Sequence, residues 1–143
     1  MRIIHFFMPV CLLAFACCNK PANTDEVTSH ELQWKKAAIH QYTYTLRVNC
    51  FCPVSVVGPH VIKVVADTIV SVNGSPYQPA ITGKLPTLPE LFSFIRESDT
   101  KKPYQRKVQF NGFYGFPESV YYDFSEQIAD EEIGYVVSNF TKN

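Results

Sequence analysis

The chain has 143 residues, which is enough for one domain with a single hydrophobic core and too few for two. Its thirteen basic and thirteen acidic side chains cancel, so it lacks the basic excess that nucleic-acid binding requires. Eleven Phe and eight Tyr accompany aliphatic residues spread along the chain, a composition typical of a folded, sheet-rich domain.

The first sixteen residues have the layout of a secretory signal. Arg2 supplies a positive charge, and a short apolar stretch follows it up to Ala16. A membrane-spanning helix needs about 20 apolar residues, whereas this stretch is shorter and contains His5 and Pro9. We therefore predict a signal peptide over residues 1–16, and a transmembrane anchor is the weaker interpretation.

The residues before Cys17 resemble the lipobox of bacterial lipoproteins, in which small residues precede a cysteine that receives a diacylglyceryl group. The common box has Leu three places before the cysteine, where this chain has Ala14. Cys18 is the alternative lipidation site, and an ordinary secretory signal cleaved near Ala16 is the alternative to lipidation. Several acyl chains on one residue suffice for stable attachment. The expected partner is thus a membrane of the bacterial cell envelope, reached through lipid on Cys17.

Residues 17–29 are predicted to be a lipidated, flexible tether, because they are mostly small and polar and show no apolar period. A single folded domain is expected over residues 30–143. Its first element is a short helix over residues 31–41, where apolar side chains follow a helical stripe. The clearest strand follows over residues 42–52, where apolar and polar side chains alternate.

Two β-rich runs, residues 61–66 and 68–72, leave room only for a tight reversal at Asp67, which predicts a hairpin or a sharply bent strand pair. A second helix is expected to begin after Thr87, a capping residue, and to end by Asp99.

Three further strands are expected over residues 107–110, 119–124 and 133–140. The predicted fold class is therefore α+β: an antiparallel β-sheet with two helices packed on one face, in the order α-β-β-β-α-β-β-β.

Several segments between residues 34 and 140 together resemble an uncharacterised family of bacterial domains, the domain of unknown function numbered 6174, which is often found on exported lipoproteins. They are Trp34 before Tyr42-Thr43-Tyr44, Cys50-Phe51-Cys52-Pro53, Leu88-Pro89-Glu90-Leu91-Phe92, Tyr114-Gly115-Phe116-Pro117 and Ala129-Asp130-Glu131-Glu132-Ile133-Gly134-Tyr135. The resemblance implies the extent of the domain and no activity. The family commonly has Tyr where this chain has Phe116.

Cys50 and Cys52 are the most chemically suggestive residues, because a close pair outside the cytoplasm either oxidises or holds a metal. Residues two apart in a regular strand are too distant for a disulfide, so the strand must bend if they bond, and Pro53 favours a bend. A local staple or two buried thiols is the plain interpretation. The alternatives are a redox pair, which so small a ring would make easy to reduce, and a soft-metal site such as Cu(I) with His60 as a further ligand.

Acidic residues gather late in the chain, and they offer oxygen ligands for a metal such as calcium. The candidates are Asp123, Asp130, Glu131 and Glu132, with Glu126 nearby. They lack the spacing of a dedicated calcium loop, so a solvated turn between two strands is the better explanation.

Residues 111–117 combine turn-forming glycines with aromatic rings. Phe113, Tyr114 and Phe116 are the binding candidates, suited to a sugar or a peptide, although such rings also close the end of a core.

The sequence contains no nucleophile-elbow serine and no phosphate loop. Its histidines have no metal-ligand spacing, and His30 and His40, which border the first helix, suit surface or capping roles. We therefore name no catalytic residue and expect no cofactor. The leading hypothesis is a membrane-anchored envelope lipoprotein with a non-enzymatic domain that binds an envelope protein or a cell-wall ligand. The rival is a thiol-redox or soft-metal-handling protein that uses Cys50 and Cys52, and a hydrolase with dispersed residues is a third, weaker alternative.

Overall fold

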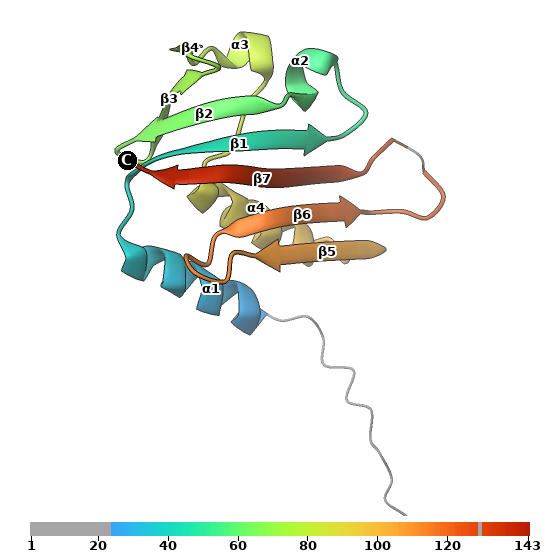
Figure 1. Cartoon of the computed structure of the whole chain (residues 1–143). Helices are drawn as coiled ribbons and strands as arrows, with labels where there is room; N and C mark the ends of the chain where they lie inside the picture. The colour runs from blue at the N-terminus through green and yellow to red at the C-terminus, as the bar shows by residue number, and fades with distance from the viewer. Residues whose placement is uncertain (1–23, 129) are drawn as a thin grey trace, which may run out of the picture.

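The computed structural model describes residues 24–128 and 130–143 of the chain (Figure 1). The predicted signal peptide and both candidate lipidation sites, Cys17 and Cys18, lie outside the described residues.

Helix α1 spans Thr24–Ala37, so it begins within the segment that we expected to be a flexible tether. Val27 explains the difference, because its side chain is only 1% exposed and packs in the core. A lone apolar residue among polar neighbours gives no periodic signal, yet its burial fixes the first turns of the helix. The expectation of a tether is therefore corrected to a helix for residues 24–29.

Strand β1 spans Gln41–Asn49 and ends before the expected Cys52, because the chain turns sharply at Cys50. It pairs antiparallel with β2 (His60–Val65), which in turn pairs with β3 (Thr68–Val72). The predicted reversal between these two strands is confirmed. A further strand, β4 (Ser75–Pro76), pairs with β3 and was not expected.

On the other side of β1 lies β7 (Ile133–Lys142), followed by β6 (Pro117–Asp123) and then β5 (Gln105–Phe110). Within the described residues, the result is one antiparallel sheet of seven strands in the order β4-β3-β2-β1-β7-β6-β5. β1 is the central strand. The sheet thus joins the first and second halves of the chain through the β1–β7 pair.

Three helices besides α1 occur in the described part of the chain: α2 (Val54–Val57), α3 (Pro79–Thr82) and α4 (Leu88–Thr100). The expected capping of α4 is confirmed, because Thr87 and Glu90 form a capping box in which each side chain bonds the other's backbone. The expected order of elements is incomplete. It lacks α2, α3 and β4, which are too short to give a periodic signal.

The alternation along β1 puts its apolar side chains on one face, where they are buried with those of α1 and α4. Trp34 of α1 packs edge-on against Tyr42 of β1, with the ring centroids 5.5 Å apart. Tyr42 accepts a hydrogen bond from the backbone N–H of Leu88 at 3.3 Å, and Tyr44 donates one to the carbonyl of Pro86. Figure 1 shows α4 behind the sheet, with α1 beside it.

Candidate functional site

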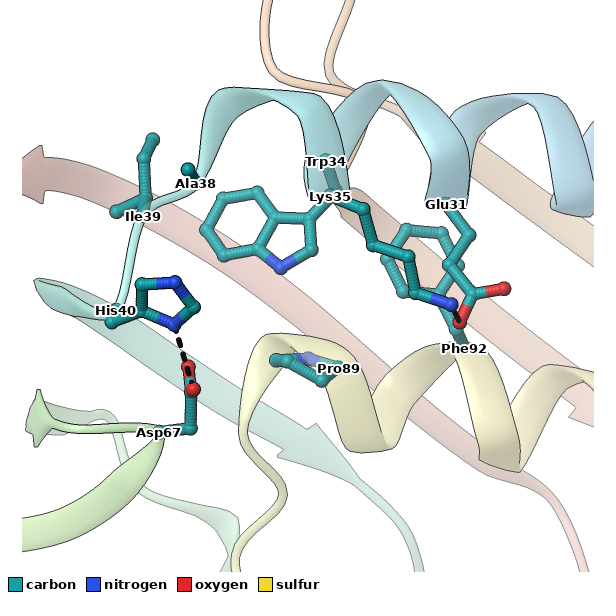
Figure 2. A pocket seen from close by; sticks show the side chains of 9 residues that line it. All are labelled: Glu31, Trp34, Lys35, Ala38, Ile39, His40, Asp67, Pro89 and Phe92. Atoms are coloured by element: carbon teal, nitrogen blue, oxygen red, sulfur yellow. Dashed lines mark hydrogen bonds and ion pairs between the residues drawn. The ribbon is translucent and has the colours of Figure 1, made fainter.

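A concave pocket opens where the end of α1, the start of β1, the β2–β3 turn and the start of α4 meet (Figure 2). Its volume is about 310 Å³. We call it the α1–α4 pocket and define it by its lining residues, which are Glu31, Trp34, Lys35, Ala38, Ile39, His40, Asp67, Pro89 and Phe92.

Apolar side chains that also belong to the core form the inner wall of this pocket. Trp34, Ile39 and Phe92 are all buried, and Pro89 comes from the first turn of α4. Because these groups are fixed by packing against the sheet, the wall is rigid and already formed. Such a wall suits an apolar ligand surface.

One side of the rim carries a polar pair, His40 and Asp67, which Figure 2 shows facing each other. Nδ1 of His40 lies 2.7 Å from Oδ2 of Asp67, and the backbone N–H of Asp67 donates to the carbonyl of His40 at 3.3 Å. Ala66 and Asp67 both have positive φ, which gives the tight turn that brings Asp67 to this position. The pair therefore holds the β2–β3 turn against the α1–β1 junction.

Glu31 closes the opposite side of the pocket and links α1 to α4. Its carboxylate accepts hydrogen bonds from Arg96 of α4 and pairs with Lys35 at 3.0 Å. Burial by itself raises the pKa of Glu31, but the bonds from Arg96 and Lys35 outweigh it, so the pKa lies below its ordinary value. Glu31 is thus held as a carboxylate that is already satisfied by protein cations.

A second hollow, of about 590 Å³, shares Asp67 and Pro89 with the α1–α4 pocket. Ile69, Tyr77 and Leu85 are among its lining residues. The two hollows are therefore adjacent and meet at Asp67 and Pro89.

The aromatic binding candidates lie elsewhere, in the loop between β5 and β6. Phe113, Tyr114 and Phe116 line a hollow of about 320 Å³ together with residues of β7. Phe116, however, is only 2% exposed and belongs to the core. Of the three rings it is therefore the deepest part of this hollow. Gln33 of α1 donates to the carbonyls of Gly112 and Phe113 and fixes this loop to the helix.

The structure places Cys50 and Cys52 in a disulfide directly after β1. The backbone bends there as the sequence required, and the N–H of Cys52 donates to the carbonyl of Cys50 at 2.9 Å. Cys52 is exposed, while Cys50 is half-buried against the core. His60, the candidate further metal ligand, is buried, with Nε2 2.9 Å from the carbonyl oxygen of Val56.

The acidic candidates Asp123, Asp130, Glu131 and Glu132 are not brought together as a metal site. Among the residues with a described placement, no group of three or more His, Cys, Asp or Glu side chains could hold a metal ion. Asp123 instead accepts a hydrogen bond from the backbone N–H of Ser125 at 3.1 Å, as in an ordinary turn.

Sequence reasoning missed the α1–α4 pocket. His40 was placed beside the first helix and Asp67 in a reversal, but they are 27 positions apart, and no spacing signal connects them. The available signal was indirect: Asp67 at a two-residue turn and His40 at a helix-to-strand junction are both residues that the backbone presents outward.

The sequence model of a family of unknown function (DUF6174) matches residues 26–142. Neither a curated protein nor a solved structure matches the chain significantly. Within residues 24–128 and 130–143, none of the helices has the length and apolar character needed to cross a membrane. The chain belongs to this DUF6174 family.

Proposed function

We propose that this chain is an exported lipoprotein of the bacterial cell envelope, held on a membrane by lipid on Cys17, whose domain binds a small amphipathic ligand in the α1–α4 pocket. The observation that supports binding is a preformed hollow of about 310 Å³ with an apolar inner wall, the His40–Asp67 pair on one side and the Glu31–Lys35 ion pair on the other. Small-molecule sites commonly combine an apolar wall with a few polar groups that fix the ligand's orientation.

The lining residues define the chemistry of the ligand. An apolar ring or chain would lie against Ala38, Pro89 and the accessible edge of Trp34, while one polar group would reach His40 or Asp67 at the rim. The neighbouring hollow, which shares Asp67 and Pro89, gives an elongated ligand room to continue. The polar end is expected to compete for the His40–Asp67 hydrogen bond.

The proposal is for binding without a reaction. Among the described residues that line the pocket there is no serine, threonine or cysteine to act as a nucleophile. His40 and Asp67 are bonded to each other, and the carboxylate of Glu31 is bonded to Arg96 and Lys35. The groups that could move protons therefore have structural partners, and no cofactor is part of the proposal.

Trp34 gives a direct test, because it is the single tryptophan of the chain and lines the pocket. Titration with N-phenyl-1-naphthylamine, a neutral apolar probe, should quench Trp34 fluorescence with a saturable curve. Ala38→Phe should abolish saturation, because Ala38 is exposed and lines the pocket. Lys102→Phe is the matched control, since Lys102 is exposed, has a positive φ of +53° close to the +48° of Ala38, and does not line the pocket. Equal quenching in both variants would refute the proposed site.

The anchor is tested separately in bacteria that express the full chain. Radioactive palmitate should label the protein, and Cys17→Ser should abolish the label while Cys18→Ser preserves it. Loss of the label only in Cys18→Ser would move the anchor by one residue. A parent chain that takes up no label would contradict a lipid anchor.

A further inference from the structure

The two sulfur atoms of the Cys50–Cys52 disulfide have different surroundings. Cys52 is exposed, whereas Cys50 packs against the hydrophobic core at the end of β1. An incoming thiolate must approach the sulfur that it attacks from the side opposite the bond that breaks, so access decides which sulfur reacts. The exposed Cys52 is therefore the sulfur open to attack, and Cys50 is the leaving group.

Two large apolar side chains lie beside this disulfide and are turned to solvent. Phe51 is 81% exposed and Val54 is 86% exposed, the highest values among the large hydrophobic residues in the described part of the chain. Helix α2, which contains Val54, has no buried residue. Apolar groups that the core does not use, placed next to an accessible disulfide, favour a surface that another molecule covers.

We propose that Cys50–Cys52 is a thiol–disulfide exchange site that takes an extended protein segment carrying two cysteines next to apolar residues. A thiolate of the partner attacks Sγ of Cys52, the Cys50–Cys52 bond breaks, and Cys50 leaves as a thiolate that takes up a proton. The second thiolate of the partner then attacks the partner's own sulfur in the mixed disulfide and releases Cys52. The partner loses two electrons and gains a disulfide, while Cys50 and Cys52 become a dithiol.

The partner class follows from the same residues. A small thiol such as glutathione touches only the exposed sulfur, whereas an extended segment also covers Phe51 and Val54. The apolar contact favours a partner whose cysteine has apolar neighbours. This site is independent of the α1–α4 pocket, because the two lie at opposite ends of β1. The disulfide follows the last residue of the strand, whereas His40 of the pocket precedes its first residue.

The test compares two synthetic probes, a peptide with Cys-x-x-Cys flanked by Leu and Phe and the same peptide flanked by Ser. The full chain purified in its oxidised form should exchange roughly tenfold faster with the apolar peptide. Phe51→Ser combined with Val54→Ser should remove this preference, and both side chains are exposed enough for the fold to persist. Leu32→Ser is the matched control, because it removes an exposed apolar side chain from α1 and should leave the preference unchanged.

The attacked sulfur is identified with single variants and a one-cysteine form of the apolar peptide, activated as its 2-thiopyridyl disulfide, so that the leaving group is lost and no second peptide thiol reverses the mixed disulfide. Cys50→Ser leaves the exposed Cys52 and should trap a mixed disulfide at least roughly tenfold faster than Cys52→Ser, as peptide mapping by mass spectrometry would show. Equal rates with the two dithiol peptides would overturn the apolar docking surface. Faster trapping at Cys50 would overturn the assignment of Cys52.

Discussion

The two candidate sites lie at opposite ends of the same central strand and are built in different ways. Before β1, the α1–α4 pocket draws its residues from α1, the β2–β3 turn and α4, with His40 at the junction. After β1, the disulfide and its apolar neighbours come from one run of residues, 50–54. One end therefore depends on the tertiary fold, and the other depends mainly on local sequence.

This difference predicts different responses to mutation. The pocket wall is shared with the hydrophobic core, so a change there alters stability and binding together. Phe51, Cys52 and Val54 are exposed, so changes there should alter partner exchange with little effect on folding.

The largest effect is expected for Phe92→Ala. This side chain is fully buried between α4 and the sheet and also lines the pocket, so its truncation leaves a cavity and should lower the free energy of unfolding by about 3–5 kcal/mol. Urea denaturation measures this loss. Phe51→Ala also removes a phenyl ring, but an exposed one after the end of β1, and it should lower the free energy of unfolding by less than about 0.5 kcal/mol. Similar losses in both variants would contradict the contrast.

Gly115→Ala should cause the second-largest loss of stability, because the added methyl group would press against α1, the helix that carries Trp34. Gly115 has φ of +84°, and an added Cβ would lie 2.5 Å from the carbonyl oxygen of His30 in α1. We expect a loss of about 2–3 kcal/mol in thermal or urea unfolding.

Gly74→Ala is the control for this prediction. Its φ is +80°, but an added Cβ would meet nothing within 4 Å, so only the backbone penalty of about 1–2 kcal/mol applies. A loss at Gly115 no larger than that at Gly74 would show that the loop is not clamped against α1.

Replacing both cysteines tests the other end of β1. The disulfide closes a loop between residues separated by only two positions, so its removal should cost no more than about 1–2 kcal/mol. The variant that combines Cys50→Ser and Cys52→Ser should therefore stay folded, and titration with the apolar probe should still quench its Trp34 fluorescence. Loss of probe binding in this double variant would connect the two ends in a way that the structure does not predict.

A smaller effect is expected for the rim pair. His40 and Asp67 are both largely exposed, and such pairs contribute about 0.2–1 kcal/mol. Asp67→Asn should therefore change the unfolding free energy by less than about 1 kcal/mol. It should also weaken the binding of a ligand whose polar group contacts the His40–Asp67 pair. Urea denaturation measures the change in stability and isothermal titration calorimetry measures the change in affinity, and a large loss of stability without a change in affinity would make the pair purely structural.

The smallest effect concerns pH and the link between α1 and α4. Because the pKa of Glu31 is lowered in the folded protein, its contribution is complete above the ordinary value of 4.5 and is lost as the pH falls through the lower, folded-state value. Glu31→Gln should thus be less stable than the parent above pH 4.5, by no more than about 1 kcal/mol, and this difference should shrink on acidification. A difference that grows toward low pH would contradict the lowered pKa.

Local patterns explain which elements could be predicted. The alternation from Tyr42 to Val48 predicted β1, and Thr87 followed by Glu90 supplied the cap of α4. The start of α1 could not be read, because Val27 is its one apolar residue before residue 30 and only tertiary contact shows that it is buried. Elements of two to four residues, such as β4 and α3, carry no period at all.

The same distinction applies to the sites. Cys50 and Cys52 were visible as a pair, because their chemistry depends on proximity in the sequence. The acidic residues from Asp123 to Glu132 were also close in sequence, yet the described ones do not converge. His40 and Asp67 converge without being close in sequence, which a one-dimensional pattern cannot show.

The most direct test of two independent sites is one set of ¹H–¹⁵N NMR spectra of the labelled domain, titrated first with N-phenyl-1-naphthylamine and then with the apolar dithiol peptide. We expect the probe to shift the amides of Trp34, Ile39, His40 and Asp67, whereas the peptide should shift those of Cys50, Phe51, Cys52 and Val54, with little overlap. Shifts from the probe that fall at residues 50–54, or that spread over the whole sheet, would contradict a pocket at the α1 end of β1.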